Sequence, residues 1–398
     1  MNILDRNYET MAADELAHFQ LERLQALLAR LKRNVRRYRE LIGDKRVESL
    51  ADLACLPVTT PEDLVAAFPF GVFALPLREV VRLHSTVGPE GRQILIGHTR
   101  GDLRHWGRLI ARQLSAAGVT AHDILQVCFQ GGISGKPLGY LLGAEMIEAS
   151  VISEDHFHIG YQLAMLQNCR ATVLVTTPTD ARELMELLGK RRVDPPSLNL
   201  RVVLLSRPVS AAEREEIAAG LSAKVWSSFG IDEILDPGLC VECAEGRYHV
   251  NEDQFLVEER DGELLVTTLC REAMPLLRYR TRTACEIRRE PCACGRTGAV
   301  LRPGERLDGR LRVNERPLYP AQIAGVLAQT PAAGFPFRLD ITERRVLVSL
   351  EIIPGVFVDT VGALADMKRE IQSEFLARLG IDVKVRYVEP AASSRAGQ

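Results

Sequence analysis

The feature that most constrains the fold is an alternation of short apolar runs with helical patterns between residues 80 and 208. The runs Ile124-Leu-Gln-Val-Cys-Phe129 and Ala171-Thr-Val-Leu-Val-Thr176 have the length of strands, whereas residues 102–117 and 180–188 carry apolar side chains at helical spacing. Strands that alternate with helices usually form parallel sheets with both faces buried. The sequence therefore predicts a large α/β domain.

The predicted secondary structure differs on either side of this region. Apolar residues at helical spacing predict one amphipathic helix over residues 14–38. After Trp226 the predicted strands are shorter, and residues 255–259 and 263–268 form a predicted hairpin through Asp261-Gly262.

The C-terminal region reads as a strand (345–352), a helix and a second strand (382–388). One face of that helix carries Leu364, Met367, Ile371, Phe375 and Leu379, which predicts a small α+β domain. We expect a large N-terminal domain over residues 1–305, a hinge over 306–310, the small domain over 311–390 and a disordered tail over 391–398.

The charge balance excludes several function classes. The 398 residues carry a formal net charge of -2, which gives no electrostatic reason to bind nucleic acid or an anionic membrane. No apolar run of about 18 residues is present, and the first ten residues do not read as a secretory signal. We expect a cytoplasmic protein whose nine cysteines are reduced.

Four residues form a candidate metal site. Cys243 and His249 are one pair, and Cys292 and Cys294 are the other. Four such ligands suit a closed, structural Zn²⁺ site, with Cys240 as a substitute ligand. The alternative is a set of reduced thiols in loops.

Several other polar residues are candidates for proton transfer or for binding an anion. His84 opens the loop before Thr86, and Asp155-His-Phe-His158 follows a predicted strand. These three histidines are predicted to lie near the cleft, where an imidazole can move a proton near neutral pH. Lys136 follows the glycine-rich stretch Gly131-Gly-Ile-Ser-Gly135 and is a candidate cation at an active site. The alternative for each is a surface or hydrogen-bonded structural role.

Six dispersed motifs, in order along the chain, resemble those of the phenylacetate-coenzyme A ligase family of adenylate-forming enzymes. They are Leu56-Pro-Val-Thr-Thr-Pro-Glu-Asp-Leu64, Phe68-Pro-Phe-Gly-Val-Phe73, Gly143-Ala-Glu145, Phe229-Gly-Ile-Asp-Glu233, Arg278-Tyr-Arg-Thr-Arg282 and Pro320-Ala-Gln-Ile323. The resemblance implies a large multilayer α/β domain followed by a small α+β domain. It also implies activation of a carboxylic acid with ATP and Mg²⁺, then transfer to coenzyme A.

The resemblance assigns a phosphate-binding loop to residues 86–93, with roles for Thr86, Gly88, Gly91 and Arg92. Arg92 stands where the family has a lysine. Two departures weaken the loop: Pro89 lacks a backbone N–H donor, and Glu90 places a carboxylate where a triphosphate would approach.

The remaining nucleotide motifs are partly kept. Phe229 and Gly230 correspond to a base- or aryl-stacking segment, and Glu233 to a Mg²⁺ ligand. Leu205 replaces a glycine next to the base, and Asp232 replaces a hydroxyl residue. A solvated acidic turn is the alternative for Asp232 and Glu233.

In the segment after Arg280, Thr283 stands where the family has a ribose-binding aspartate. Arg306 corresponds to a nucleotide-binding arginine, and Asp308 to the hinge aspartate. The family's terminal catalytic lysine has no counterpart after Lys384, where only Arg395 supplies a cation.

Two functions follow from this mixture. The sequence slightly favours a repurposed relative that acts on an aryl or acyl carboxylate, or on its thioester with coenzyme A or an acyl carrier protein, with little adenylation. The alternative is an active ligase that uses ATP and Mg²⁺. A second copy of the chain, forming a homodimer, is a further candidate partner.

Overall fold

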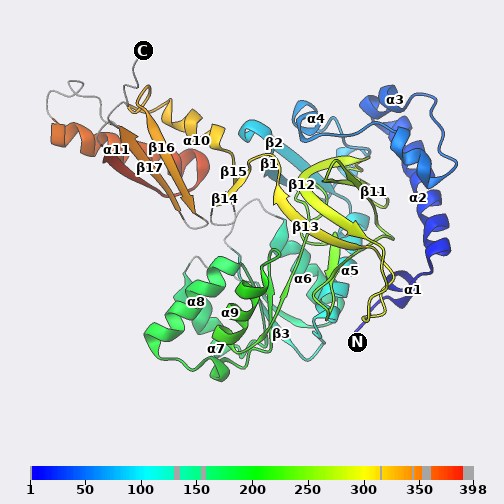
Figure 1. The fold of residues 1–398 in the computed structure, drawn as a ribbon, viewed down its shortest axis with the longest axis horizontal. Coiled ribbons are helices and arrows are strands. Elements are labelled where there is room, and N and C mark those ends of the chain that lie inside the picture. Colours follow the sequence, from blue (N-terminus) through cyan, green and yellow to red (C-terminus); the bar gives the residue numbers. More distant parts are fainter. Residues whose placement is uncertain are drawn as a thin grey trace, which may run out of the picture. The chain divides into compact units, whose positions relative to one another are not determined.

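The computed structural model describes residues 2–129, 135–153, 158–313, 316–342, 345–351 and 360–388. The chain divides into two compact units, whose elements are labelled in Figure 1. The first comprises Met1–Gly88 and Arg92–Asp308, and the second comprises Pro89–Gly91 and Gly309–Gln398. The fold class is mixed α/β, which confirms the prediction from the sequence.

A five-stranded parallel sheet lies at the centre of the first unit. Its strand order is β4-β3-β5-β6-β7, and the bounds are β3 (Ile124–Val127), β4 (Ser150–Ser153), β5 (Val173–Thr176), β6 (Val202–Leu205) and β7 (Lys224–Ser227). All pairings are parallel. Strands β5 and β6 are buried along their whole length, as expected for a sheet covered on both faces.

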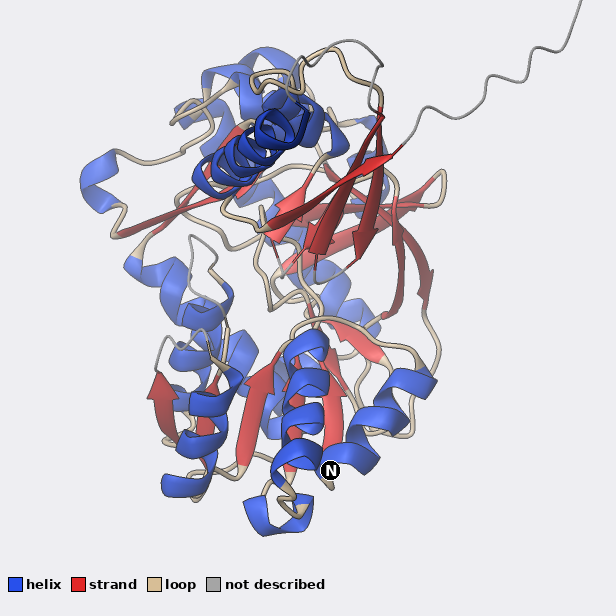
Figure 2. Cartoon of the chain, turned by 90° about the vertical axis from the view of Figure 1, so that its left-hand side faces the viewer, coloured by secondary structure: helices blue, strands red, loops and turns tan. Residues whose placement is uncertain are grey.

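Helices cover both faces of this sheet, as Figure 2 shows. Val173 and Val175 of β5 belong to a core cluster shared with α5 (Arg100–Ala116) and α6 (Lys136–Met146). Leu174, between them, belongs to another cluster. That cluster is shared with α7 (Ile159–Asn168), α8 (Pro178–Arg191) and α9 (Ala211–Leu221). The alternation follows from the two-residue period of a strand.

The first unit also contains a six-stranded antiparallel sheet and a separate hairpin. The sheet has the order β10-β11-β12-β13-β9-β8. Its strands are β8 (Cys240–Glu242), β9 (Tyr248–Val250), β10 (Phe255–Arg260), β11 (Glu263–Thr268), β12 (Tyr279–Arg288) and β13 (Val300–Arg306), and the hairpin is β1 (Arg82–Val87) with β2 (Gln93–His98). The predicted hairpin through Asp261-Gly262 is confirmed, with positive φ at both turn residues.

The predicted N-terminal helix over residues 14–38 is two helices in the structure. The helices of this region are α1 (Arg6–Glu9), α2 (Ala13–Asn34), α3 (Arg36–Ile42) and α4 (Pro61–Ala66). The break falls at Val35, whose backbone is extended (φ -116, ψ 109). Its side chain is buried in a cluster with residues of both α2 and α3, so the apolar spacing continues across a change of helix direction.

The second unit is a small α+β structure. It contains β14 (Leu311–Val313), β15 (Arg316–Leu318), β16 (Phe337–Thr342), β17 (Arg345–Glu351), β18 (Val383–Val388), α10 (Pro320–Leu327) and α11 (Thr360–Leu379). Strands β17 and β18 pair in parallel, and β16 pairs antiparallel to β17. The predicted strand, helix and strand are confirmed within the described residues, whereas residues 391–398 lie outside them.

Candidate functional site

The loop after β7 carries the predicted motif Phe229–Glu233 and makes a tight turn. The backbone N–H of Ile231 donates to the carbonyl of Leu235 over 3.2 Å. A Cβ atom on Gly230 would lie 2.4 Å from that same carbonyl oxygen, so only glycine fits at this position. The loop therefore has one compact conformation at the carboxyl end of the parallel sheet, where ligands bind in folds of this type.

A hydrogen bond connects this loop to the predicted phosphate loop. Thr86 Oγ1, near the end of β1, donates to Asp232 Oδ2 over 3.3 Å. The structure thus brings two predicted nucleotide motifs together. The next residue of the motif, Glu233, is buried.

The phosphate loop itself is a closed turn between β1 and β2. The backbone N–H of Gly88 donates to the carbonyl of Arg92 over 2.8 Å, so this donor is already used within the turn. Glu90 and Gly91 have positive φ values of 58 and 77 degrees. Arg92, the proposed replacement for the family's lysine, is exposed.

Lys136 lies at the same edge of the sheet. It is the first residue of α6, and its Nζ forms an ion pair with Asp236 Oδ2 at 3.0 Å. Nζ also donates to the carbonyl of Ser206, directly after β6, over 3.5 Å. Lys136 therefore connects the loop after β7 to the end of β6. The stretch of residues 131–134 before it is outside the described residues.

His84 belongs to a stack of rings under the site. Its ring stacks on that of His98 at 4.9 Å, with a 3.2 Å contact between His84 Nδ1 and His98 Nε2. Trp106 also stacks on His98, at 5.2 Å, and its ring lies 6.4 Å from that of His84. Its indole N–H donates to the carbonyl of Pro237 over 2.6 Å. Burial, with the nearby Arg271 cation, lowers the pKa of His84 to about 4, so the imidazole is neutral at neutral pH. Such a group accepts a proton only in markedly acid solution.

Only one residue of the other predicted histidine motif lies within the described residues. His158 is exposed at the N-terminus of α7. The remaining residues of that motif, 155–157, are outside the described residues.

The predicted ribose and hinge residues gather on β12 and β13. Arg306 Nη1 donates to Thr283 Oγ1 over 3.3 Å, and Arg306 Nε donates to Asp308 Oδ1 over 3.1 Å. Arg280 Nε donates to the buried carboxylate of Glu263 over 2.7 Å. The Arg306 guanidinium therefore binds both the Thr283 hydroxyl and the Asp308 carboxylate.

Leu205 and Phe229, which the sequence assigned to the nucleotide site, are both buried. Leu205 is completely buried in the cluster shared with α7, α8 and α9. Its side chain packs into the core, which removes the argument that this leucine crowds a purine base. Phe229 is 8% exposed and belongs to the other core cluster, so little of its ring is open to a base or aryl group.

The four predicted metal ligands meet at one end of the antiparallel sheet. The ligand atoms of Cys243, His249, Cys292 and Cys294 all lie within 4.8 Å of one another. Cys243 Sγ and Cys292 Sγ are 3.9 Å apart. Two thiolates about 2.3 Å from a tetrahedral zinc ion would be separated by roughly 3.8 Å. Cys240, the substitute ligand, is instead buried in the hydrophobic core.

The Nδ1 atom of His249 contacts a backbone carbonyl, which leaves Nε2 directed toward the other three ligands. His249 Nδ1 lies 3.0 Å from the carbonyl of Gly298, and Nε2 lies 3.3 Å from Cys294 Sγ. Burial lowers the pKa of His249, which favours the neutral imidazole that binds metals. A hydrogen bond from Nδ1 to a carbonyl orients such a ligand. The four side chains therefore form a candidate metal centre.

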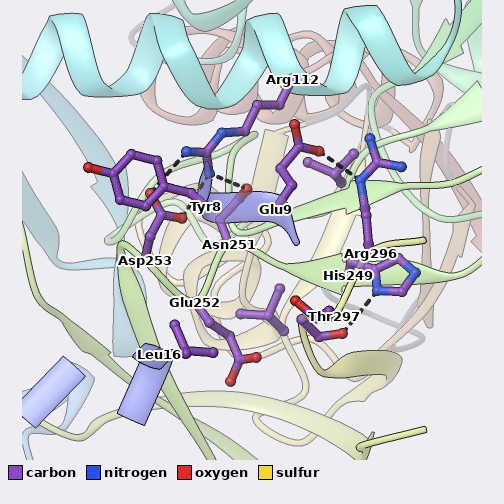
Figure 3. A pocket seen from close by; sticks show the side chains of 13 residues that line it. Tyr8, Glu9, Leu16, Arg112, His249, Asn251, Glu252, Asp253, Arg296 and Thr297 are labelled. Carbon is purple, nitrogen blue, oxygen red and sulfur yellow. Dashed lines mark hydrogen bonds and ion pairs between the residues drawn. The ribbon is translucent and has the colours of Figure 1, made fainter. Parts of the chain in front are cut away.

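The metal-ligand loop also holds the N-terminal segment, beside a small cavity of about 20 Å³ (Figure 3). Arg296, two residues after Cys294, forms a buried ion pair with Glu9 at 2.7 Å. Thr297 donates its backbone N–H to the carbonyl of Glu9 and its hydroxyl to that of Met11. The ligand loop and residues 9–11 therefore form one packed structure.

A second buried arginine lies on the other side of the cavity. Arg112 of α5 donates to Asp253 over 2.8 Å, to Asn251 over 3.1 Å and to Asp5 over 3.1 Å. The sequence analysis missed this network. The available signal was an arginine among the apolar residues of a predicted helix, directly after Leu109-Ile-Ala111.

Comparisons with known proteins agree with this architecture. Residues 316–398 match the family model of the AMP-binding enzyme C-terminal domain. A crystal structure of 2-hydroxyisobutyryl-CoA ligase, in complex with 2-HIB-AMP and CoA in the thioesterification state, aligns with a TM-score of 0.87. The two chains are 22% identical, and the alignment covers 98% of this chain and 90% of the other. The fold is that of the adenylate-forming ligases.

Proteins with similar sequences identify the family within the adenylate-forming ligases. The phenylacetate-coenzyme A ligase of Thermus thermophilus is 32% identical over 97% of this chain and 95% of its own length. The Escherichia coli K12 enzyme of the same name is 30% identical over 86% of this chain and 83% of its own. The chain belongs to the phenylacetate-coenzyme A ligase family. Among the described residues, no helix has the length and apolar character needed to cross a membrane.

Proposed function

We propose that this protein is a carboxylic acid–coenzyme A ligase that uses ATP and Mg²⁺ to form an acyl or aryl adenylate. The observation that carries the proposal is the hydrogen bond between Thr86 and Asp232. This bond joins Thr86, the first residue of the predicted phosphate loop, to the loop that also carries Glu233, and so supports a joint nucleotide site. The Thermus thermophilus relative, a phenylacetate-coenzyme A ligase matched over nearly its full length, supports the same activity.

In this proposal each group has a chemical role. Glu233 supplies a carboxylate for Mg²⁺, and Arg92 supplies a cation for the triphosphate. The Arg306 guanidinium, already bonded to Thr283 and Asp308, orients the ribose side of the nucleotide. Positioned cations and donors of this kind stabilise the charge that develops on a transferring phosphoryl group.

A second function is favoured by the phosphate loop. Pro89 has no N–H, and the N–H of Gly88 is used within the turn, so this loop offers few donors to a phosphate. These features favour a protein that binds an acid or its thioester, with coenzyme A or an acyl carrier protein, without adenylation. An acyl carrier protein, a homodimer and a cytoplasmic location remain predictions.

Pyrophosphate exchange and AMP release, measured over a panel of aryl and short-chain acids with and without coenzyme A, distinguish the two functions. The ligase proposal expects exchange with at least one acid and its loss in Glu233→Gln. The matched control is Glu245→Gln, since Glu245 is exposed. Thioester binding with no exchange for any acid would favour the second function.

We also propose that the metal centre holds a structural Zn²⁺. The donor set of three sulfur atoms and one imidazole is complete at four ligands, which is typical of structural zinc sites. The distance between Cys243 Sγ and Cys292 Sγ supports this choice.

A further inference from the structure

A buried arginine connects two parts of the candidate site. Arg271 lies in the connection between β11 and β12, and its side chain is buried. Its guanidinium donates from Nη1 to the backbone carbonyl of Ile234, the residue after Glu233. From Nη2 it donates to the carbonyl of Gly97 in β2 over 3.0 Å. One side chain therefore joins the loop that carries Glu233 to the hairpin that carries the phosphate loop.

The backbone around Arg271 is itself held by two helices. Arg30 of α2 donates to the backbone carbonyl of Arg271. The carboxylate of Asp102, in the first turn of α5, accepts from the backbone N–H groups of Glu272 and Ala273 over 2.7 and 3.1 Å. Both ends of the side chain are therefore fixed. Reacting groups need such support, because a misplacement of about 1 Å can cost about 10²-fold in rate.

The energetics of this arginine indicate a role beyond stability. Among the described residues, its guanidinium forms no ion pair with a carboxylate, and its Nε is buried without a hydrogen-bond partner. Burying a cation without a paired anion is costly, and an apolar side chain at a buried charged position is often no less stable. A planar guanidinium, however, holds two carbonyls in a set geometry. A methionine binds neither carbonyl, and the ammonium of a lysine lacks the planar fork.

We propose that Arg271 is a positioning residue for adenylation, which fixes the loop of Glu233 relative to the hairpin of the phosphate loop. This inference rests on the proposed function, because it concerns the loops that would bind Mg²⁺ and the triphosphate. The hydrogen bond between Thr86 and Asp232 joins the same loop and hairpin at a second point. The role of Arg271 is indirect, since its guanidinium acts through two backbone carbonyls.

Steady-state pyrophosphate exchange with the full-length protein tests this role. Arg271→Met is expected to lower kcat about 100-fold and to change the KM for the acid less than about threefold, because a misplaced loop affects the transition state more than acid binding. Arg271→Lys, which keeps the cation, should have an intermediate kcat. The control is Arg296→Met, at a buried arginine of the metal-ligand loop that is paired with Glu9. It should lose more stability than Arg271→Met but keep the wild-type kcat at a temperature where it is folded.

Hydrogen exchange provides a second measurement that does not depend on turnover. The backbone N–H groups of Ile231 and Ile234 are bonded within the turn of the loop, and in Arg271→Met they should exchange at least about 10-fold faster, with the parallel sheet unchanged.

The outcomes separate the two proposals. An unchanged kcat or unchanged loop exchange in folded Arg271→Met overturns the positioning role and leaves the ligase proposal standing. A wild-type protein that exchanges no pyrophosphate with any acid rejects the ligase proposal, and the hydrogen exchange of the loop then decides whether Arg271 fixes it. If Arg271→Met does not fold, Arg271→Lys takes its place in both measurements.

Discussion

Cys243 Sγ and Cys292 Sγ lie 3.9 Å apart although 49 positions separate the two residues in the sequence. This separation matches two ligands of one tetrahedral zinc ion and is well beyond the length of a disulfide bond. The relationship joins the loop after β8 to the loop between β12 and β13, and it leads to the first prediction.

The purified protein is expected to contain about one zinc ion per chain. Cys294→Ser should lower both the metal content and the melting temperature, because metal binding contributes to folding free energy. Cys55→Ser, at an exposed cysteine, is the control and should change neither. Elemental analysis and thermal denaturation check this. A wild-type protein that stays free of metal after expression with added zinc would refute the assignment.

Replacing Arg296 is expected to be strongly destabilising. Arg296→Met leaves the Glu9 carboxylate buried without its partner, and breaking such a pair typically costs about 3–5 kcal/mol in the free energy of unfolding. Arg247→Met removes an exposed ion pair with Glu290, for which a cost below about 1 kcal/mol is expected. Urea denaturation measures both. Similar costs for the two variants would contradict the prediction.

Removal of the metal should release the N-terminal segment before the rest of the first unit. The bonds from Arg296 and Thr297 to residues 9–11 depend on the conformation of the ligand loop. A chelator is therefore expected to increase hydrogen exchange in α1 and in residues 292–298 first. Exchange that rises uniformly across the unit, or only in the parallel sheet, would argue against this coupling.

Acidification should destabilise the first unit over a pH range that is set by the pKa values of two buried histidines. Burial, mainly, lowers the pKa values of His84 and His98, that of His84 to about 4. The unfolded chain takes up these protons near pH 6.5, while the folded protein does not. The free energy of unfolding therefore falls as the pH drops from about 6.5 to 4, by up to about 1.4 kcal/mol per pH unit for each histidine.

Substitution isolates this contribution. His84→Asn should reduce the slope of stability against pH in that range, whereas His122→Asn, at an exposed position, should leave it unchanged. Urea titrations at a series of pH values provide the measurement. An unaltered slope in His84→Asn would mean that other groups cause the acid sensitivity.

Gly230→Ala is expected to disrupt the candidate site. Its Cβ would lie 2.4 Å from the backbone oxygen of Leu235, so the loop must shift, at a cost of about 1–3 kcal/mol. Gly189→Ala is the matched control, because a Cβ there meets no atom within 4 Å. That change in α8 should stabilise the protein by up to about 1 kcal/mol. Thermal denaturation measures the stability of both variants, and calorimetric titration measures their binding of the acids. Unchanged acid binding in Gly230→Ala would contradict the prediction.

Much of the fold follows from local pattern in the sequence. Buried strands such as Val173–Thr176 read as apolar runs, and the Asp261-Gly262 turn has a well-known preference for hairpins. The break between α2 and α3 at Val35 could not be predicted, because two helices joined at an angle show the same apolar spacing as one straight helix. Strand β16 was also missed, since four of its six side chains are exposed.

The candidate site was less accessible to sequence reasoning. Motifs assigned Thr86 and the loop of Glu233 to the same function, but the contact between Thr86 and Asp232 depends on how a hairpin meets a loop far away in the sequence. Asp236 had no signal of its own, because an acidic residue before a proline is common in turns. Leu205 looked like a site residue in the motif, whereas its side chain points into the core. Such differences depend on side-chain direction, which a motif does not record.

The ion pair between Glu9 and Arg296 joins residues 287 positions apart. During synthesis at 5–20 residues per second, the N-terminal segment would wait about 15–60 seconds for its partner to be made. Until then Glu9 has no buried cation to pair with, and the cysteine loop has no N-terminal surface to pack on. The first helix of the chain is therefore among the last parts of the first unit to reach its final place, and nascent chains shorter than about 300 residues should leave it accessible to chaperones.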